Sequence, residues 1–185
     1  TSDLTIKATA GTTTMPSLLS ISGDYTNNSA KPVDFGSGTV VLNGTTGQTA
    51  TGTMTGTSAF NALTISNTSQ NGTTSQSVIF GATASTTGTF TMLASTSAQF
   101  TAGATSSFQN IDFQGISGSP VWLRSSVSGT QWSMEVAGTQ ISVEYVDVQD
   151  SNACTAYADI AVSEGTNSGN NSCWTFLDEA DISSA

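Results

Sequence analysis

The chain has 185 residues, enough for one domain with a sizeable core. Only 9% of the residues are charged while 36% are hydrophobic, and three basic residues stand against thirteen acidic ones, so the formal net charge is −10. Nucleic acid is excluded as an expected partner, because binding it needs clustered lysine and arginine. Membrane insertion is not expected either, because no apolar stretch approaches the length of a membrane span.

Residues 1–16 are predicted to form an N-terminal strand that precedes the repeats. Within residues 2–10, Leu4 and Ile6 alternate with polar residues, which is typical of a strand. We expect this strand to serve as an assembly arm, with Leu4 and Ile6 pairing with a neighbouring copy by strand addition. The alternative is a first strand that packs on its own chain.

Residues 17–126 are predicted to form β-repeats, with almost no helix because no segment spaces its apolar residues three and four apart. Short apolar alternations recur between glycine, serine and asparagine, and threonine favours strands. The segments from residue 58 and from residue 106 can be superposed with an offset of 48 residues. This offset suits two turns of a parallel β-solenoid, in which each coil buries its apolar face against its neighbours. The aligned pairs are Phe60 with Phe108, Leu63 with Ile111, and Ile65 with Phe113.

Residues 127–185 are predicted to form a C-terminal β segment that caps the solenoid. Its strand signals, at 132–136 and 141–148, are more closely spaced. Cys154 and Cys173 are separated by eighteen residues rich in asparagine, serine and glycine, and we expect a disulfide between them. Such a bridge contributes about 3 kcal/mol and indicates an oxidising compartment. The alternative is a pair of buried or reduced thiols.

The segments 20–27, 35–44 and 60–67 together resemble the repeats of bacterial surface β-helix proteins of the haemagglutinin and autotransporter-adhesin kind. The stretch 141–151, followed by 166–176, looks like the closing segment of such secreted proteins. The resemblance covers about residues 17–176 and implies a right-handed parallel β-helix on an exported protein, but no single activity. A β-sandwich is the alternative fold, because many short strands separated by turns give the same pattern.

Catalysis is not expected, and no catalytic or cofactor-binding residue is assigned. The chain has no histidine, which removes the Ser-His-Asp and Cys-His arrangements. Paired carboxylates, as used by glycosidases, are interpreted as a solvated outer face instead. Their members lie in the second half of the chain near Arg124: Asp112, Glu135, Glu144, Asp147 and Asp150.

A calcium site is the one candidate metal site, and no other cofactor is expected. Asp147, Asp150 and Asp159, with Asn152, offer the oxygen ligands that calcium prefers. Their spacing matches neither an EF-hand loop nor a glycine-rich calcium repeat.

Two surface patterns suggest binding. Threonines alternate strictly from Thr49 to Thr57, so an extended strand would place them on one face, suited to ice or a crystalline polysaccharide. An exposed strand or loop gives the same pattern. Trp122, Trp132 and Trp174 are interpreted as core, with stacking on sugar rings as the alternative.

These features favour an extracellular or cell-surface structural protein, a self-assembling surface or filament subunit whose partners are copies of itself. The alternative is an adhesin or carbohydrate-binding module that recognises surface glycans. An ice-binding protein and a polysaccharide-degrading enzyme are further alternatives.

Overall fold

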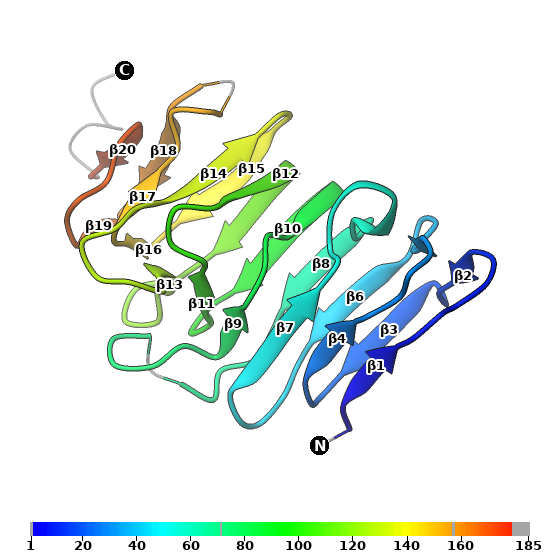
Figure 1. Ribbon diagram of the computed structural model, residues 1–185. Helices are drawn as coiled ribbons and strands as arrows, with labels where there is room; N and C mark the ends of the chain where they lie inside the picture. The colour runs from blue at the N-terminus through cyan, green and yellow to red at the C-terminus, as the bar shows by residue number, and fades with distance from the viewer. Residues whose placement is uncertain (1, 71, 157, 179–185) are drawn as a thin grey trace.

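A computed structural model describes residues 2–70, 72–156 and 158–178 of the chain (Figure 1). These residues form a parallel β-solenoid of about seven turns. All pairings between named strands are parallel, which confirms the predicted solenoid and excludes the β-sandwich. The only helical element in the described ranges is a short 3-10 turn, η1 (Gly56–Ser58).

Two long sheets run along the solenoid, and each coil adds one strand to each. Sheet 1 contains β1 (Leu4–Ile6), β4 (Tyr25–Asn27), β7 (Gln48–Gly52), β9 (Val78–Phe80), β11 (Ser97–Phe100), β13 (Val121–Ser125), β16 (Val146–Val148) and β19 (Thr166–Asn167). Sheet 2 contains β3 (Leu18–Ile21), β6 (Thr39–Leu42), β8 (Ala62–Ile65), β10 (Ser85–Leu93), β12 (Thr105–Gln114), β15 (Gln140–Glu144), β18 (Ile160–Ser163) and β20 (Trp174–Leu177). In addition, β14 (Trp132–Val136) pairs with β12, and β17 (Ser151–Asn152) pairs with β14. A small third sheet joins β2 (Thr13–Thr14) to β5 (Val33–Asp34) in the first two coils.

The strand register confirms the internal repeat. Leu63 lies opposite Phe90, and Phe90 lies opposite Ile111, so the predicted offset of 48 residues spans two coils. The coils have unequal lengths, because the connection between β8 and β9 carries a long loop at residues 66–77.

Inward side chains form one continuous core, and aromatic rings stack along its axis. Phe100 lies between Phe80, at a centroid distance of 5.1 Å, and Trp132, at 3.9 Å. Phe90 stacks on Phe108 at 4.5 Å. Because parallel coils place equivalent positions above one another, a similar apolar residue in each coil produces these stacks. The interpretation of Trp132 as a core residue is therefore confirmed.

The C-terminal segment continues both sheets, since β14 to β20 all pair with strands of sheet 1 or sheet 2. The predicted strand at 141–148 is not one strand, however. Tyr145 adopts a positive φ of 47° and turns the chain from β15 in sheet 2 to β16 in sheet 1. Tyr145 is consequently half-buried at a corner, whereas regular alternation from Val143 would point it inward, and Val146 takes the inward position instead.

The predicted disulfide is present between Cys154 and Cys173. It joins the connection that follows β17 to the residue that precedes β20, so it ties two neighbouring coils together at the C-terminal end.

Candidate functional site

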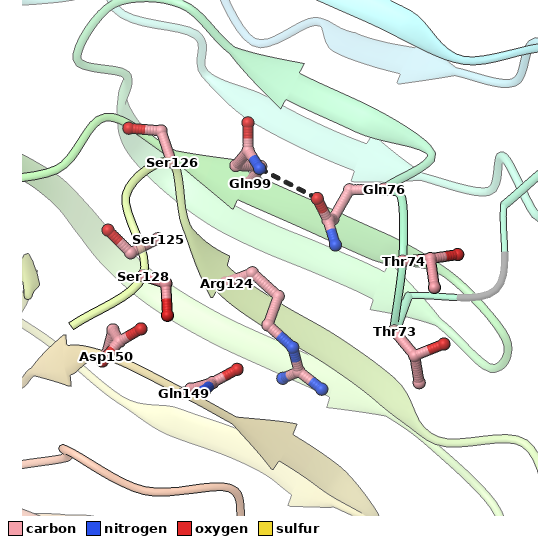
Figure 2. A pocket seen from close by; sticks show the side chains of 10 residues that line it. All are labelled: Thr73, Thr74, Gln76, Gln99, Arg124, Ser125, Ser126, Ser128, Gln149 and Asp150. Atoms are coloured by element: carbon pink, nitrogen blue, oxygen red, sulfur yellow. Dashed lines mark hydrogen bonds between the residues drawn. The ribbon is translucent and has the colours of Figure 1, made fainter. Parts of the chain in front are cut away.

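A polar cleft of about 320 Å³ opens on the outer face of sheet 1 (Figure 2). Strands β11 and β13 form its floor, and the loops at residues 73–76 and 125–128 form its rims. All of its lining residues carry a polar side chain: Thr73, Thr74, Gln76, Gln99, Arg124, Ser125, Ser126, Ser128, Gln149 and Asp150. Strand alternation explains the floor, because Leu123 points into the core and Arg124 therefore points out.

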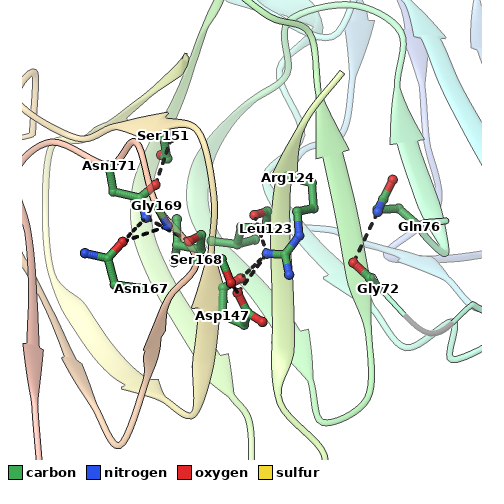
Figure 3. Close-up of polar contacts among 11 residues, drawn as sticks. Gly72, Gln76, Leu123, Arg124, Asp147, Ser151, Asn167, Ser168, Gly169 and Asn171 are labelled. Atoms are coloured by element: carbon green, nitrogen blue, oxygen red, sulfur yellow. Dashed lines mark hydrogen bonds and ion pairs between the residues drawn. The ribbon is translucent and has the colours of Figure 1, made fainter. Parts of the chain in front are cut away.

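Arg124 is held rigidly at the centre of this cleft. Its Nη1 donates to the Leu123 carbonyl at 3.0 Å and to the Asp147 carbonyl at 2.7 Å. The same nitrogen lies 3.0 Å from Asp147 Oδ1, in an ion pair whose side chains are only 10% and 16% exposed (Figure 3). The guanidinium charge is thereby balanced within the protein, which a buried charge requires.

Two glutamines form the opposite wall. Gln99 Nε2 donates to Gln76 Oε1 at 2.9 Å, and Gln76 Nε2 donates to the Gly72 carbonyl at 3.2 Å. Gly72 has a φ of +72°, and a Cβ at this position would lie 2.3 Å from the Trp122 ring. Only glycine fits there, so the close approach of the loop to Trp122 fixes the wall. Trp122 is thus an outward, half-buried residue rather than a core residue.

Asp150 anchors the other rim. Its Oδ2 accepts a hydrogen bond from the Gly129 N–H at 3.0 Å, and its Oδ1 accepts one from Asn170 Nδ2 at 2.7 Å. Ser125 Oγ donates to the Thr130 carbonyl at 2.6 Å, and Ser126 Oγ accepts from the Ala102 N–H at 2.9 Å. The loop at 125–130 is therefore tied to both neighbouring coils.

A polar network below the cleft supports Asp147 (Figure 3). Ser168 Oγ donates to Asp147 Oδ1 at 2.6 Å. Asn171 Nδ2 donates to the Val148 carbonyl at 2.7 Å and to Asn167 Oδ1 at 2.7 Å, while its Oδ1 accepts from the Ser151 N–H at 3.0 Å. No sequence motif marks the cleft itself, and the asparagine- and serine-rich run at 166–171 is the one sequence signal of this supporting network.

The predicted calcium ligands are engaged separately. Asp147 pairs with Arg124, and both oxygens of Asp150 accept hydrogen bonds. The carbonyl of Asp159 accepts a hydrogen bond from Gln140 Nε2 at 3.0 Å, beside sheet 2. Within the described ranges, no three histidine, cysteine or carboxylate side chains are grouped as a metal site would require.

The candidate catalytic carboxylates are divided between the two sheets. Asp112 and Glu144 lie on sheet 2, and Glu135 on β14 accepts a hydrogen bond from Ser107 Oγ at 2.7 Å. Asp147 lies on β16 of sheet 1, and Asp150 follows that strand. Because Tyr145 bends the chain between them, Glu144 and Asp147 belong to different faces of the solenoid.

The threonine series does not form one flat array. Thr49 and Thr51 lie on β7, but that strand ends at Gly52, which has a φ of +85°. Beyond it, Met54 bridges to Ala84 and η1 begins at Gly56, so the alternation no longer follows one face. Across the coils, Thr26 Oγ1 lies 3.2 Å from Thr51 Oγ1, next to Thr5 of β1.

The strand that carries the predicted assembly residues is part of the solenoid. Leu4 pairs with Tyr25 and Ile6 with Asn27, in parallel. Ile6 is buried, whereas Leu4 is only partly buried against the core. The opposite edge of β1 has no partner strand among the described residues.

Together these features define a disulfide-linked parallel β-solenoid protein with a polar surface cleft. No family model, curated protein or solved structure matches this chain. The β-helix fold implied by the resemblance is confirmed, and the surface-adhesin class stays a prediction. None of the helical structure in the described part of the chain is long and apolar enough to cross a membrane.

Proposed function

We propose that the protein is an extracellular structural subunit that joins copies of itself end to end into a continuous solenoid. One observation carries the proposal: the inward side chains of the first and last described coils are incompletely covered. Partly buried apolar residues that pack on the core gather mainly at these two ends.

At the N-terminal end, Leu4, Met15 and Leu19 pack against the core but remain partly buried. The strands of this coil, β1, β2 and β3, each pair on one side only within the described residues (Figure 1). Open strand edges are templates for pairing with a further chain. The N-terminal end therefore offers both unpaired backbone groups and apolar area.

At the C-terminal end, Cys173, Trp174 and Phe176 are likewise only partly buried against the core. Strands β19 and β20 end sheet 1 and sheet 2 with one neighbour each among the described residues. A second copy whose first strands pair with β19 and β20 would continue both sheets with parallel strands. Such a head-to-tail contact does not close on itself and generates a filament.

The disulfide and the surface support an extracellular setting for this assembly. Disulfides persist in oxidising compartments. With few charges, the surface depends on neutral threonine, serine, asparagine and glutamine for its polarity, unlike that of most cytosolic proteins.

A proline at the open edge of β1 tests the proposal. Leu4 N–H donates to the Asp24 carbonyl and the Ile6 carbonyl accepts from Asn28, so these residues face β4 and the intervening Thr5 turns its N–H to the open edge. Thr5→Pro removes that donor without removing a bond to β4. Thr5→Val, which keeps the N–H, is the matched control.

Sedimentation velocity over a concentration series is the measurement. We expect the unmodified chain and Thr5→Val to form polymers that grow with concentration, and Thr5→Pro to remain mostly monomeric with unchanged circular dichroism. Monomers at all concentrations of the unmodified chain, or equal polymerisation of the proline variant, would overturn the proposal.

A further inference from the structure

We propose that the cleft on sheet 1 is a binding site for a neutral carbohydrate of one or two sugar units. The proposal is independent of end-to-end assembly, because the cleft lies on the side of the solenoid, between β9 and β16, and away from both end coils.

The charges of the cleft favour an uncharged ligand. Arg124 is neutralised by Asp147 at 3.0 Å, and Asp150 adds a further negative charge. The whole chain carries a formal net charge of −10, which repels anions at longer range. A cation is also disfavoured, since the oxygens of Asp150 already accept hydrogen bonds from Gly129 and Asn170.

The hydrogen-bonding groups left over in the cleft are both donors and acceptors. The side chains of Gln149 and Ser128 make no hydrogen bond to another described residue, and Arg124 uses only Nη1, leaving Nη2 and Nε. Gln99 donates through Nε2, so its Oε1 remains available as an acceptor. Sugar hydroxyl groups both donate and accept, and amide, guanidinium and hydroxyl groups complement them.

Three of the residues that line the cleft are held in place before any ligand arrives. Gln76 is 9% exposed, Arg124 is 8% exposed and Asp150 is 4% exposed, and each is bonded to backbone. A site that is already ordered loses little conformational freedom on binding. In Figure 2 the two glutamines lie across the cleft from Arg124 and Gln149, so one ligand can contact both walls.

The size and polarity of the cleft define the ligand further. Its volume of about 320 Å³ is at the lower end of the range for ligand sites, roughly 300–1,000 Å³. Its lining offers polar side chains alone, so an apolar ligand or an apolar peptide side chain would leave these groups without partners. A small polyhydroxy ligand satisfies them.

Titration of the ¹⁵N-labelled 185-residue chain, followed by NMR, tests this site. The probes are the methyl glycosides of glucose, galactose, mannose and N-acetylglucosamine, with cellobiose and lactose. Galacturonate and inorganic phosphate are the anionic probes. We expect at least one neutral probe to shift the side-chain amide signals of Gln99 and Gln149 and the backbone signals of residues 125–128, while the anions do not.

Three variants complete the test. Gln149→Ala removes an unpaired cleft amide, and Ser128→Trp fills the cleft from an exposed loop position away from the core. Both variants should bind the neutral probe at least tenfold more weakly than the unmodified chain does. Gln109→Ala, an exposed glutamine on sheet 2, should change nothing. Absence of binding by every neutral probe, preference for the anions, or shifts that survive both cleft variants would overturn the proposal, and none of these outcomes bears on polymerisation.

Discussion

The two halves of the solenoid share one core but carry different outer surfaces. Residues 35–111 contain no charged residue, whereas residues 135–185 contain nine acidic residues and no basic one. The disulfide lies in the second region, whereas the cleft lies where the two regions meet and takes lining residues from both. Inward positions repeat in both halves. The contacts among the rings of Phe80, Phe90 and Phe100 extend to the ring of Trp132 in the next coil. The inward residues thus determine the fold, and the outward residues are free to differ.

The largest expected effect comes from a substitution in the shared core. Phe90 is fully buried and contacts the rings of Phe80, Phe100, Phe108 and Phe113. Phe90→Ala should lower the free energy of unfolding by about 3–5 kcal/mol. Leu93 lies on the same strand with its side chain outward and 36% exposed, so Leu93→Ala should cost less than about 1 kcal/mol. Urea unfolding measures both losses. Similar losses of unfolding free energy for the two variants would refute the division between inward and outward positions.

Loss of the disulfide should affect only the second half strongly. Replacing Cys154 and Cys173 by serine removes a crosslink that contributes about 3 kcal/mol. Since the bridge ties the last coils, amide hydrogen exchange should accelerate in residues 146–178 and remain slow in β4 to β8. Uniform acceleration along the chain would show that the solenoid unfolds as a single unit.

A smaller effect is expected from the ion pair between Arg124 and Asp147 in the floor of the cleft. Asp147→Ala leaves the buried Arg124 guanidinium without its counter-charge and should cost about 2–3 kcal/mol in thermal or urea unfolding. The loss should shrink only slightly when salt is added, because a buried pair is screened weakly. A loss below about 0.5 kcal/mol would indicate that Asp147 does not hold Arg124 in solution.

The smallest effect concerns Tyr25 in the first half. Burial raises the pKa of its hydroxyl above the ordinary value, and the nearby Asn27 side chain offsets only part of this increase. The hydroxyl makes no well-formed hydrogen bond to a described residue. Tyr25→Phe should therefore raise the free energy of unfolding by about 1 kcal/mol near neutral pH.

The pH dependence of this variant has a definite sign. Above about pH 10 the unfolded tyrosine loses its proton while the folded one retains it, so the unmodified protein loses stability as the pH rises. The Tyr25→Phe variant should lose less stability over the same rise in pH. Parallel stability curves for the two proteins between pH 9 and pH 11, chosen to bracket roughly the ordinary tyrosine pKa, would contradict this expectation.

The sequence predicts the solenoid well because its inward positions repeat. Phe60, Leu63 and Ile65 find their equivalents two coils later, and the strand register places them as predicted. The bend at Tyr145 was not predictable from alternation, since a non-glycine residue with a positive φ leaves the apolar pattern unbroken.

The cleft could not be predicted for a different reason. Gln76, Gln99, Arg124 and Gln149 come from four different coils, and only the coil lengths bring them together. Those lengths depend on loops such as 66–77, which carry no apolar repeat. The pairing of Cys154 with Cys173 was predictable because these are the only two cysteines.

Cryo-electron microscopy of the 185-residue chain, kept oxidised and imaged over a concentration series, tests end-to-end assembly most directly. Each of the two long sheets has eight strands stacked along the axis, and each strand adds about 4.8 Å, so continuous sheets predict filaments with an axial subunit repeat of roughly 38 Å. Filaments with that repeat, and with both sheets continuous across the junction, are the expected result. Discrete monomers throughout, or polymers joined through the sides of the solenoid, would contradict it.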